Sequence, residues 1–443
     1  MSSGDAASTR RNPAGLLILL GVVLLVVLVT YLPSVGRDDV DHQGRAVVHV
    51  WSWNIAGDAL IAVTDDFETI HPDTDVRIEK NGTMSTSRLL LSMVAGKGGP
   101  DVAQLQEREA ERFTRTGRIV KLTDWAGRYE NDFPQSFWQS CVYEGDVYAI
   151  PWDIGPVAVY YKRWIFERYN IDPDTIETWD DFIRVGEQIT SQSGGATAMM
   201  PMLATELQDF LQIFMQQNGG GVFNEQGQIV LHQRANVEAL ELIGRLLQSP
   251  ATRPGSMYSN EFLASLGADT TACFVGPAWQ SANVKDYSPP ELAGQWGILR
   301  LPAMRPGGVR NSNFGGSVLV IPESSSQQPP AEQFIEYALC TVPGQIEQFK
   351  KYGLFPAYLP AHDDPFFQEP DPFYGGQKIN AIFAQDFENV PPMIRTSDWT
   401  EAQRLMTQWL IQFAEKPTDA SGFLKRMSDE LAARTGRDIG DVQ

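Results

Sequence analysis

Cysteine is scarce in this chain, and so are histidine and the basic residues. Three cysteines, Cys141, Cys273 and Cys340, are spread over 443 residues, so there is neither a disulfide framework nor a paired CxxC zinc motif. One disulfide is compatible with the sequence, but we expect three small buried thiols. Lysine and arginine number 35 against 55 acidic residues, which gives a net charge of −20. So acidic a surface repels phosphate backbones and argues against a nucleic-acid partner.

Catalytic signatures are missing as well. The chain has no HExxH motif, no GxSxG motif and no P-loop GKS or GKT, and its five histidines are scattered. We therefore expect no metal ion, no cofactor and no catalytic residue. What the chain does have is length, because 443 residues exceed the roughly 250–300 at which a single hydrophobic core stops growing. Two lobes are expected.

The N-terminal region has the pattern of a membrane anchor. Residues 1–13 form a short polar tail with Arg10 and Arg11, and residues 14–32 are almost continuously apolar. That run falls within the roughly 17–25 residues that span a bilayer. The arginines place the tail in the cytoplasm and the rest of the chain, after a polar linker at 33–45, on the extracytoplasmic (periplasmic) side. A cleaved signal peptide is the alternative, but the run is long for one and no small-residue cleavage motif follows it.

Strand-like segments alternate with helical periodicity between residues 46 and 105. Strands are predicted at 46–51, 74–79 and 101–105, with helices at 58–70 and 88–95. This alternation is typical of a parallel, doubly wound α/β sheet, in which ligands bind beyond the carboxyl ends of the strands. We expect the residues that follow each strand to share that edge, although each one taken singly could be a rim aromatic, a turn former or a helix start. They are Trp53 and Asn54, then Asn81 and Thr83, then Gln106 and Glu107.

The segment 147–161, VYAIPWDIGPVAVYY, places prolines between two strand-like runs. Proline lacks an N–H and interrupts a sheet ladder, so the pattern indicates an edge, a bend or a crossover. Trp152 and Asp153 at the interruption offer an apolar face beside a hydrogen-bond acceptor. The segment is either a crossing between two lobes, with a ligand cleft beside it, or a surface turn.

Several motifs, in order along the chain, carry a resemblance to a known family. They include VVHVWSWN, GGPDVAQLQ, VYAIPWDIGPVAVYYKRWIFE, FVGPAWQSANV, GGSVLVIPESS and YGLFPAY. Over about residues 47–434 the chain resembles the carbohydrate-binding extracytoplasmic solute-binding proteins of ABC importers, the group that includes maltose-binding protein.

The resemblance implies a two-lobe α/β periplasmic-binding-protein fold with three interlobe crossovers. We expect these at 147–161, 296–301 and 352–358. Lobe I would then hold residues 46–155 and 296–350, and lobe II residues 156–295 and 351–443.

Further site residues follow from the same comparison. Trp279 comes after a strand and a Gly-Pro break, where the family places a ligand-stacking aromatic, and Trp399 lies near another such position. Gly315 and Gly316 are small enough to let the backbone approach a ligand. Sugars present a C–H face and hydroxyls at the ring edge. Trp53, Trp152 and Trp279 would pack against the C–H face of the sugar. Asn54, Glu107 and Asp153 would form hydrogen bonds with the hydroxyls at its edge.

The function implied is capture of a carbohydrate or small polar solute by hinge closure, and delivery to the permease subunits of an ABC transporter at the membrane. Two alternatives come from other classes. A membrane-tethered glycoside hydrolase would use Glu107 and Asp153 as a carboxylate pair. A sugar-sensing module would signal through the anchor, although a cytoplasmic tail of residues 1–13 has no room for an output domain.

Overall fold

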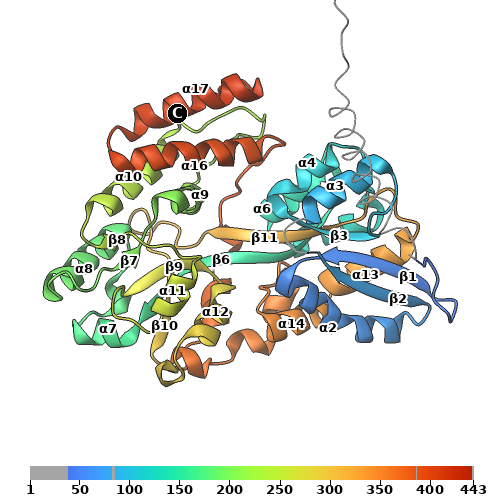
Figure 1. Cartoon of the computed structure of the whole chain (residues 1–443), viewed down its shortest axis with the longest axis horizontal. Helices are drawn as coiled ribbons and strands as arrows, with labels where there is room; N and C mark the ends of the chain where they lie inside the picture. Colours follow the sequence, from blue (N-terminus) through green and yellow to red (C-terminus); the bar gives the residue numbers. More distant parts are fainter. Residues whose placement is uncertain (1–37, 82–84, 386, 442–443) are drawn as a thin grey trace, which may run out of the picture.

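The computed structural model describes residues 38–81, 85–385 and 387–441, and Figure 1 shows them as two lobes joined by long strands. Lobe I, the half built on the first three strands, begins with β1 (Ala46–Ser52), β2 (Thr74–Lys80) and β3 (Val102–Gln106). These pair in parallel, with Ala46 opposite Thr74 and Val50 opposite Val102. The β-branched residues of β1 pack into the core. Between the strands lie α2 (Asn54–Ile70) and α3 (Ser85–Ala95), as a doubly wound sheet requires.

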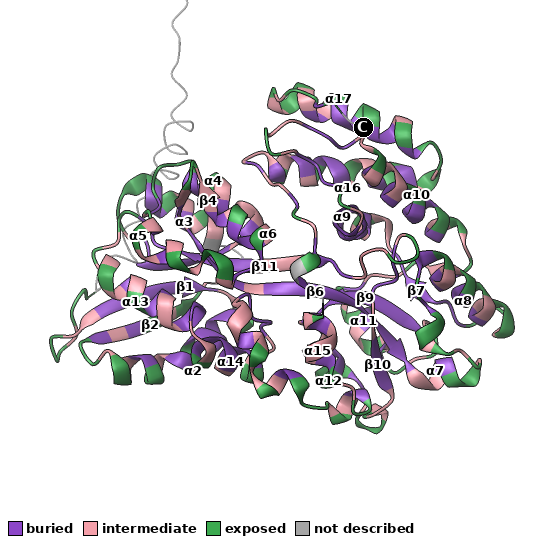
Figure 2. Ribbon diagram, turned by 180° about the vertical axis from the view of Figure 1, so that it is seen from behind, coloured by how far each residue is buried: buried purple, intermediate pink, exposed green. Residues whose placement is uncertain are grey.

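Two long strands run through both lobes. They are β6 (Ile150–Lys162) and β11 (Asn313–Val320), which pair antiparallel. One end of β11 pairs with β3, while the far half of β6 pairs with β9 (Cys273–Pro277) and β10 (Trp296–Arg300). The result is one seven-stranded sheet, which forms the buried centre of the molecule in Figure 2.

The segment around Trp152 therefore differs from the sequence-based expectation of two strands and a bend. Both prolines sit inside the single strand β6, which lies between β11 on one side and β9 and β10 on the other. Gly155 makes this possible, because a Cβ there would collide with the carbonyl oxygen of Phe314. Its backbone N–H donates to the Asn313 Oδ1 atom at 2.8 Å.

The second crossing is β11, whereas the sequence analysis placed it at 296–301. That segment is β10, which pairs with residues 158–162 of β6 and belongs to lobe II. Lobe II is the half built on β9, β10 and the far end of β6. The crossing was misplaced because an apolar strand has the same sequence pattern whether it ends inside one lobe or continues into the other.

A further connection runs beside β6 at residues 353–358. The Ile154 N–H donates to the Phe355 carbonyl oxygen at 3.0 Å, and the Ala357 N–H donates to the Trp152 carbonyl oxygen at 3.1 Å. This segment links α14 (Val342–Tyr352), which packs on α2, to α15 (Ile379–Ala384), which packs on β10.

The helices of lobe II flank its end of the sheet. Its long helices are α8 (Trp179–Gln192), α9 (Leu207–Gln217), α10 (Arg234–Gln248), α16 (Trp399–Glu415) and α17 (Ala420–Thr435). Further helices of the molecule are α4 (Ala110–Thr114), α5 (Thr123–Ala126), α6 (Gln135–Trp138), α7 (Arg163–Arg168), α11 (Asn260–Ser265), α12 (Gln280–Tyr287) and α13 (Gln328–Leu339). Two small ladders pair β4 (Val142–Tyr143) with β5 (Asp146–Val147) and β7 (Met200–Pro201) with β8 (Thr252–Arg253).

The predicted anchor at 14–32 lies outside the described residues. Among those that are described, no helix is both long and apolar enough to cross a bilayer. The second half of the predicted linker is not a free chain, because Val40 bridges to Ala46 and the segment 38–45 lies against β1. The three cysteines are buried and free, which confirms the expectation of isolated thiols.

Replacing Gly155 with alanine should destabilise the protein by forcing β6 and β11 apart. We expect the Gly155→Ala variant to lose about 1–3 kcal/mol of unfolding free energy, measured by urea denaturation, because overpacking strains a dense core. Gly127→Ala is the control, since a Cβ at that position meets nothing within 4 Å. Equal stability of the two variants would show that the two strands are not in close contact at Gly155.

Candidate functional site

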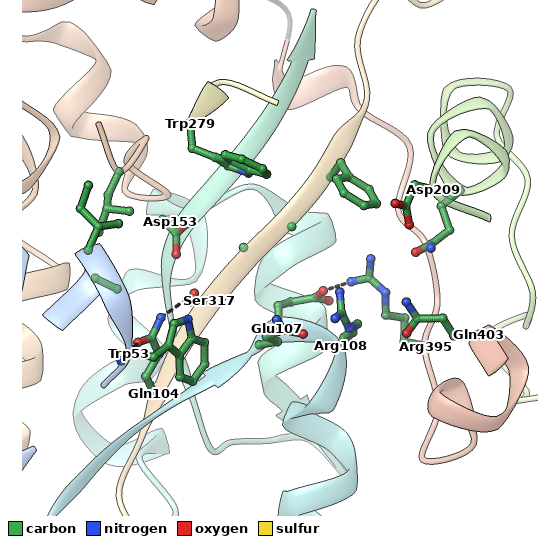
Figure 3. Close-up of a pocket in the computed structure, with 18 of the residues that line it drawn as sticks. Trp53, Gln104, Glu107, Arg108, Asp153, Asp209, Trp279, Ser317, Arg395 and Gln403 are labelled. Carbon is green, nitrogen blue, oxygen red and sulfur yellow. Dashed lines mark hydrogen bonds and ion pairs between the residues drawn. The ribbon is translucent and has the colours of Figure 1, made fainter. Parts of the chain in front are cut away.

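A cleft of ≈ 550 Å³ lies between the two lobes, with the shared strands as its floor. The carboxyl ends of β1 and β3 supply one wall, and α9 with the start of α16 supplies the other (Figure 3). The wall in lobe I carries Trp53, Gln104, Gln106, Glu107 and Arg108. The opposite side carries Gln208, Asp209, Gln212, Tyr258, Trp279, Arg395 and Gln403, and the floor carries Asp153 and residues 314–317.

Seven of the residues expected from sequence line this cleft. They are Trp53, Gln106, Glu107, Asp153, Trp279, Gly315 and Gly316. The glycines have φ angles of +92° and +124°, in the region that favours glycine. A Cβ on Gly316 would lie 2.6 Å from the Phe137 ring, and one on Gly315 would lie 3.8 Å from the Trp279 indole nitrogen. Glycine at 315 thus leaves the floor open beneath Trp279, and glycine at 316 allows β11 to pass close to Phe137.

Trp152 is not in the cleft. It is 1% exposed, and its indole N–H donates to the Gln348 Oε1 atom at 2.7 Å in the core. Successive side chains of a strand point to opposite faces, so with Asp153 in the cleft its neighbour must point away. A bend at the prolines would have brought both side chains to the site, whereas a continuous strand brings only Asp153.

Trp399 and Asn81 also lie elsewhere. Trp399 begins α16 and is 1% exposed, with the Arg395 guanidinium 5.0 Å from its ring centre. Asn81 accepts a hydrogen bond from the Arg88 guanidinium at 2.6 Å. Thr83 lies outside the described residues. Asn54 begins α2 rather than a loop, and its side chain is likewise outside the description.

One end of the cleft is charged, and this was largely missed from sequence. Glu107 forms an ion pair with Arg395, and their side chains are 4% and 13% exposed. Burial lowers the pKa of Arg395 to about 10. The pair joins lobe I to the segment that leads into α16. Glu107 and Arg395 are far apart in sequence, and no motif marks Arg395.

Asp209 faces the same end of the cleft from α9. Burial raises its pKa to about 7, with a further rise from the charge of Glu206, while Arg108 opposes the shift. Burial has the opposite effect on a base, and it lowers the pKa of the Arg108 guanidinium. The charged end thus combines two guanidinium groups with two carboxyl groups.

The other end of the cleft is aromatic and polar, and the hydrogen bonds of Gln104 connect its parts. The Gln104 side-chain oxygen accepts from the Ser52 hydroxyl at 2.6 Å and from the Trp53 backbone N–H at 3.2 Å. Its amide nitrogen donates to the Ser317 hydroxyl at 2.9 Å. A single buried side chain therefore ties β1, β3 and β11 together and fixes the backbone from which Trp53 projects.

Asp153 lies on the floor between Trp53 and Trp279 (Figure 3). Burial raises the pKa of its carboxyl to about 6, although hydrogen bonding to Ser317 pulls in the other direction. Within the described part of the chain, its Oδ1 atom has no hydrogen-bond partner. A buried carboxyl oxygen without a partner is costly when it is ionised, which agrees with the raised pKa of this group.

Comparisons with known proteins agree with this architecture. Residues 51–339 match the family described as bacterial extracellular solute-binding protein. A lactose-binding protein of Rhizobium radiobacter is 26% identical, with 88% of this chain and 93% of that protein covered. An arabinooligosaccharide-binding protein of Halalkalibacterium halodurans is 25% identical, with 77% of each covered.

Solved structures show the same fold. The sugar-binding protein MalE of Xanthomonas citri has a TM-score of 0.77 at 18% identity, with 88% of this chain and 98% of that chain covered. A binding protein of B. animalis subsp. lactis in complex with beta-1,6-galactobiose has a TM-score of 0.72 at 23% identity, covering 89% of this chain and 99% of that one.

The carboxyl of Asp153 should make the stability of the empty protein depend on pH. A carboxyl whose pKa is raised from 3.8 to about 6 on folding stabilises the folded state fully below the lower value. That contribution is lost as the pH rises through the higher value. We expect the unfolding free energy to fall between about pH 4 and 6 and the Asp153→Asn variant to fall less over that range. Urea denaturation at successive pH values measures this, and parallel profiles for the two proteins would contradict it.

Proposed function

Because the chain belongs to the bacterial extracellular solute-binding protein family, we propose that it captures a carbohydrate or a related polyhydroxylated solute and delivers it to an ABC importer. The observation that carries this proposal is that Trp53 and Trp279, from opposite lobes, line the same cleft on either side of the Asp153 carboxyl. The names of relatives that bind arabinooligosaccharides and lactose support the same solute class.

The cleft has the groups that a sugar needs. Indole rings pack against the C–H face of a pyranose or furanose, while planar amides donate to and accept from its hydroxyls and carboxylates accept from them. Gln106, Gln208, Gln212 and Gln403 line the walls as amides, and Asp153 lies on the floor. A volume of ≈ 550 Å³ lies within the roughly 300–1,000 Å³ typical of small-ligand sites.

Capture would proceed by hinge closure. A ligand that contacts both walls binds the closed arrangement better than the open one, and this difference alone shifts the equilibrium. A preference of ~100-fold supplies ~2.7 kcal/mol, enough to reverse a modest bias toward the open state. The shared strands and the segment 353–358 connect the lobes beneath the cleft, where a bend opens or closes it.

We further propose that residues 14–32 anchor the protein as a single membrane-spanning helix, with the two lobes on the extracytoplasmic side. The apolar run and the arginines before it support this assignment. Tethering would raise the effective concentration of the loaded protein at permease subunits in the same membrane.

The arrangement of the carboxyl groups in the cleft favours binding over catalysis. Glu107 is engaged by Arg395, whereas a glycoside hydrolase needs one carboxylic acid to protonate the leaving group and a second carboxylate to act on the sugar. The relatives named above are binding proteins.

A sugar screen tests the proposal directly. We expect at least one mono- or oligosaccharide to raise the melting temperature and to change the tryptophan fluorescence of the purified protein. The Trp279→Ala variant should lose this ligand-induced shift because it lacks the ring face. Trp152→Phe is the matched control, since it alters a buried indole outside the cleft and should lower basal stability while keeping the shift. Overnight incubation with the same sugars should give no cleavage products, and product formation would sink the binding hypothesis.

The ion pair between Glu107 and Arg395 should bias the lobes toward each other. Removing one partner of a buried pair costs about 3–5 kcal/mol, because the other charge stays buried and uncompensated. We expect Glu107→Gln to enlarge the radius of gyration of the ligand-free protein in small-angle scattering and to weaken sugar binding. Glu401→Gln is the control, since Glu401 pairs with Arg404 and Arg434 inside lobe II. An unchanged radius for Glu107→Gln would remove the pair from the closure mechanism.

A further inference from the structure

Residues 38–45, which we call the strap, lie against the first half of β1 as part of lobe I. Val40 forms an antiparallel bridge with Ala46, and the Val47 N–H donates to the Asp39 carbonyl oxygen at 3.0 Å. β3 pairs with β1 only from Val50 onward. The strap therefore occupies the side of β1 that β3 leaves free, and it satisfies backbone groups that would otherwise form an exposed sheet edge.

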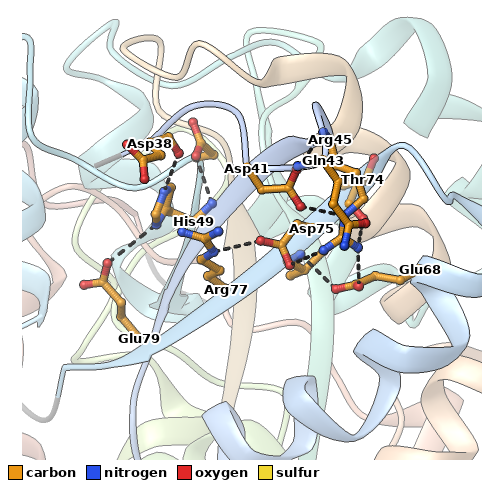
Figure 4. Close-up of polar contacts among 12 residues, drawn as sticks. Asp38, Asp41, Gln43, Arg45, His49, Glu68, Thr74, Asp75, Arg77 and Glu79 are labelled. Atoms are coloured by element: carbon orange, nitrogen blue, oxygen red, sulfur yellow. Dashed lines mark hydrogen bonds and ion pairs between the residues drawn. The ribbon is translucent and has the colours of Figure 1, made fainter. Parts of the chain in front are cut away.

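Arg45 fastens the inner end of the strap (Figure 4). Its guanidinium reaches three carboxylates, at 2.7 Å from Asp41, 3.0 Å from Glu68 of α2 and 3.2 Å from Asp75 of β2. Single surface ion pairs contribute little, but a shared network with defined geometry contributes more. Burial disfavours the ionised form of Asp41, yet hydrogen bonds from Arg45 and Gln43 outweigh it and hold its pKa at about 2. The Asp41–Arg45 pair is thus fully charged at neutral pH.

The outer end of the strap is held by lobe I as well. The Gln327 amide donates to the Asp39 carbonyl oxygen at 3.0 Å. The His49 Nε2 atom lies 3.3 Å from the carbonyl oxygen of Asp38. The segment is therefore attached at both ends and along its middle, which is not the behaviour of a flexible spacer.

This attachment shortens the connection to the predicted anchor. If residues 33–45 were all free, thirteen residues would reach up to ~47 Å, but with the strap folded only residues 33–37 remain, which reach at most ~18 Å. The strap also docks far from the ligand. Trp53 lies four residue steps beyond His49 along the chain, which is ~13 Å at the rise of a strand, and it lies at the cleft end.

We propose that the strap is a permanent part of lobe I and holds that lobe at the surface of the lipid bilayer, so that lobe II is the half that moves during closure. This inference rests on the proposed membrane anchor. It makes the end of lobe I away from the cleft the membrane-proximal end.

Hydrogen exchange on the full chain in lipid nanodiscs tests the folded state of the strap. Peptides that cover residues 38–45 should be protected in the natural protein and exchange at least about tenfold faster in Arg45→Gln, since local opening sets the rate. Arg77→Gln is the matched control, because Arg77 also pairs with Asp75, at 2.8 Å, but does not touch the strap. Full exchange in the natural protein, or equal rates in both variants, would overturn the proposal.

Energy transfer measures the distance from lobe I to the bilayer. A fluorophore on Val94→Cys, at a position that is 76% exposed, should transfer efficiently to acceptors on lipid headgroups. Labelling is specific because the three natural cysteines are buried. Transfer should fall in Arg45→Gln, and also when eight glycine and serine residues are inserted before Asp38 in a chain whose strap is intact. Equal transfer in all three proteins would overturn the proposal.

Membrane fractionation distinguishes a failure of the strap proposal from a failure of the proposed membrane anchor. A natural protein found in the soluble fraction would refute the anchor and the membrane part of the inference together, while strap protection in hydrogen exchange would still be measurable. A membrane-bound protein with an unprotected strap would refute the strap alone.

Discussion

The close contact between β6 and β11 is the constraint on which the rest of the molecule depends. Gly155 faces the carbonyl of Phe314 with no room for a side chain, and its N–H is held by Asn313. Because this contact lies where the two lobes meet, it forms the floor of the cleft and the place about which the walls can turn. A change of register at this point would move Asp153 off the floor and exchange it with the core residues on either side of it.

The two ends of the cleft carry different kinds of polar group. Around Trp53, polar groups are satisfied by neutral partners, with Gln104 as the shared donor and acceptor. Toward α16, charged groups satisfy each other through Glu107 and Arg395. Neutral networks fix geometry at little electrostatic cost, whereas a buried ion pair is sensitive to anything that separates its members. The end around Trp53 is thus suited to hold a ligand in one orientation. The end with Glu107 and Arg395 is suited to respond to a change in the distance between the lobes.

The sequence predicted the parts of the site that depend on local rules. Trp53 and Glu107 follow parallel strands and Gln106 ends one, and the carboxyl ends of these strands share one edge of the sheet. Trp279 was expected from the resemblance to the family and not from a local rule. Local rules failed for Trp152, because proline suggested a bend where glycine at 155 allows the strand to continue. Asp209 and Arg395 carried no local signal. They reach the cleft only because α9 and the segment before α16 pack against the far end of the sheet.

The three buried thiols set a condition on folding. Burial raises the pKa of Cys141 to about 12 and that of Cys273 and Cys340 well above the ordinary range, so almost no reactive thiolate exists once the chain is folded. An unfolded chain has no such protection. If the lobes fold outside the cytoplasm, the newly exported chain exposes three ordinary thiols to an oxidising compartment. Burial must then outpace oxidation, because the native core has places for three separate sulfurs and none for a bridge between them.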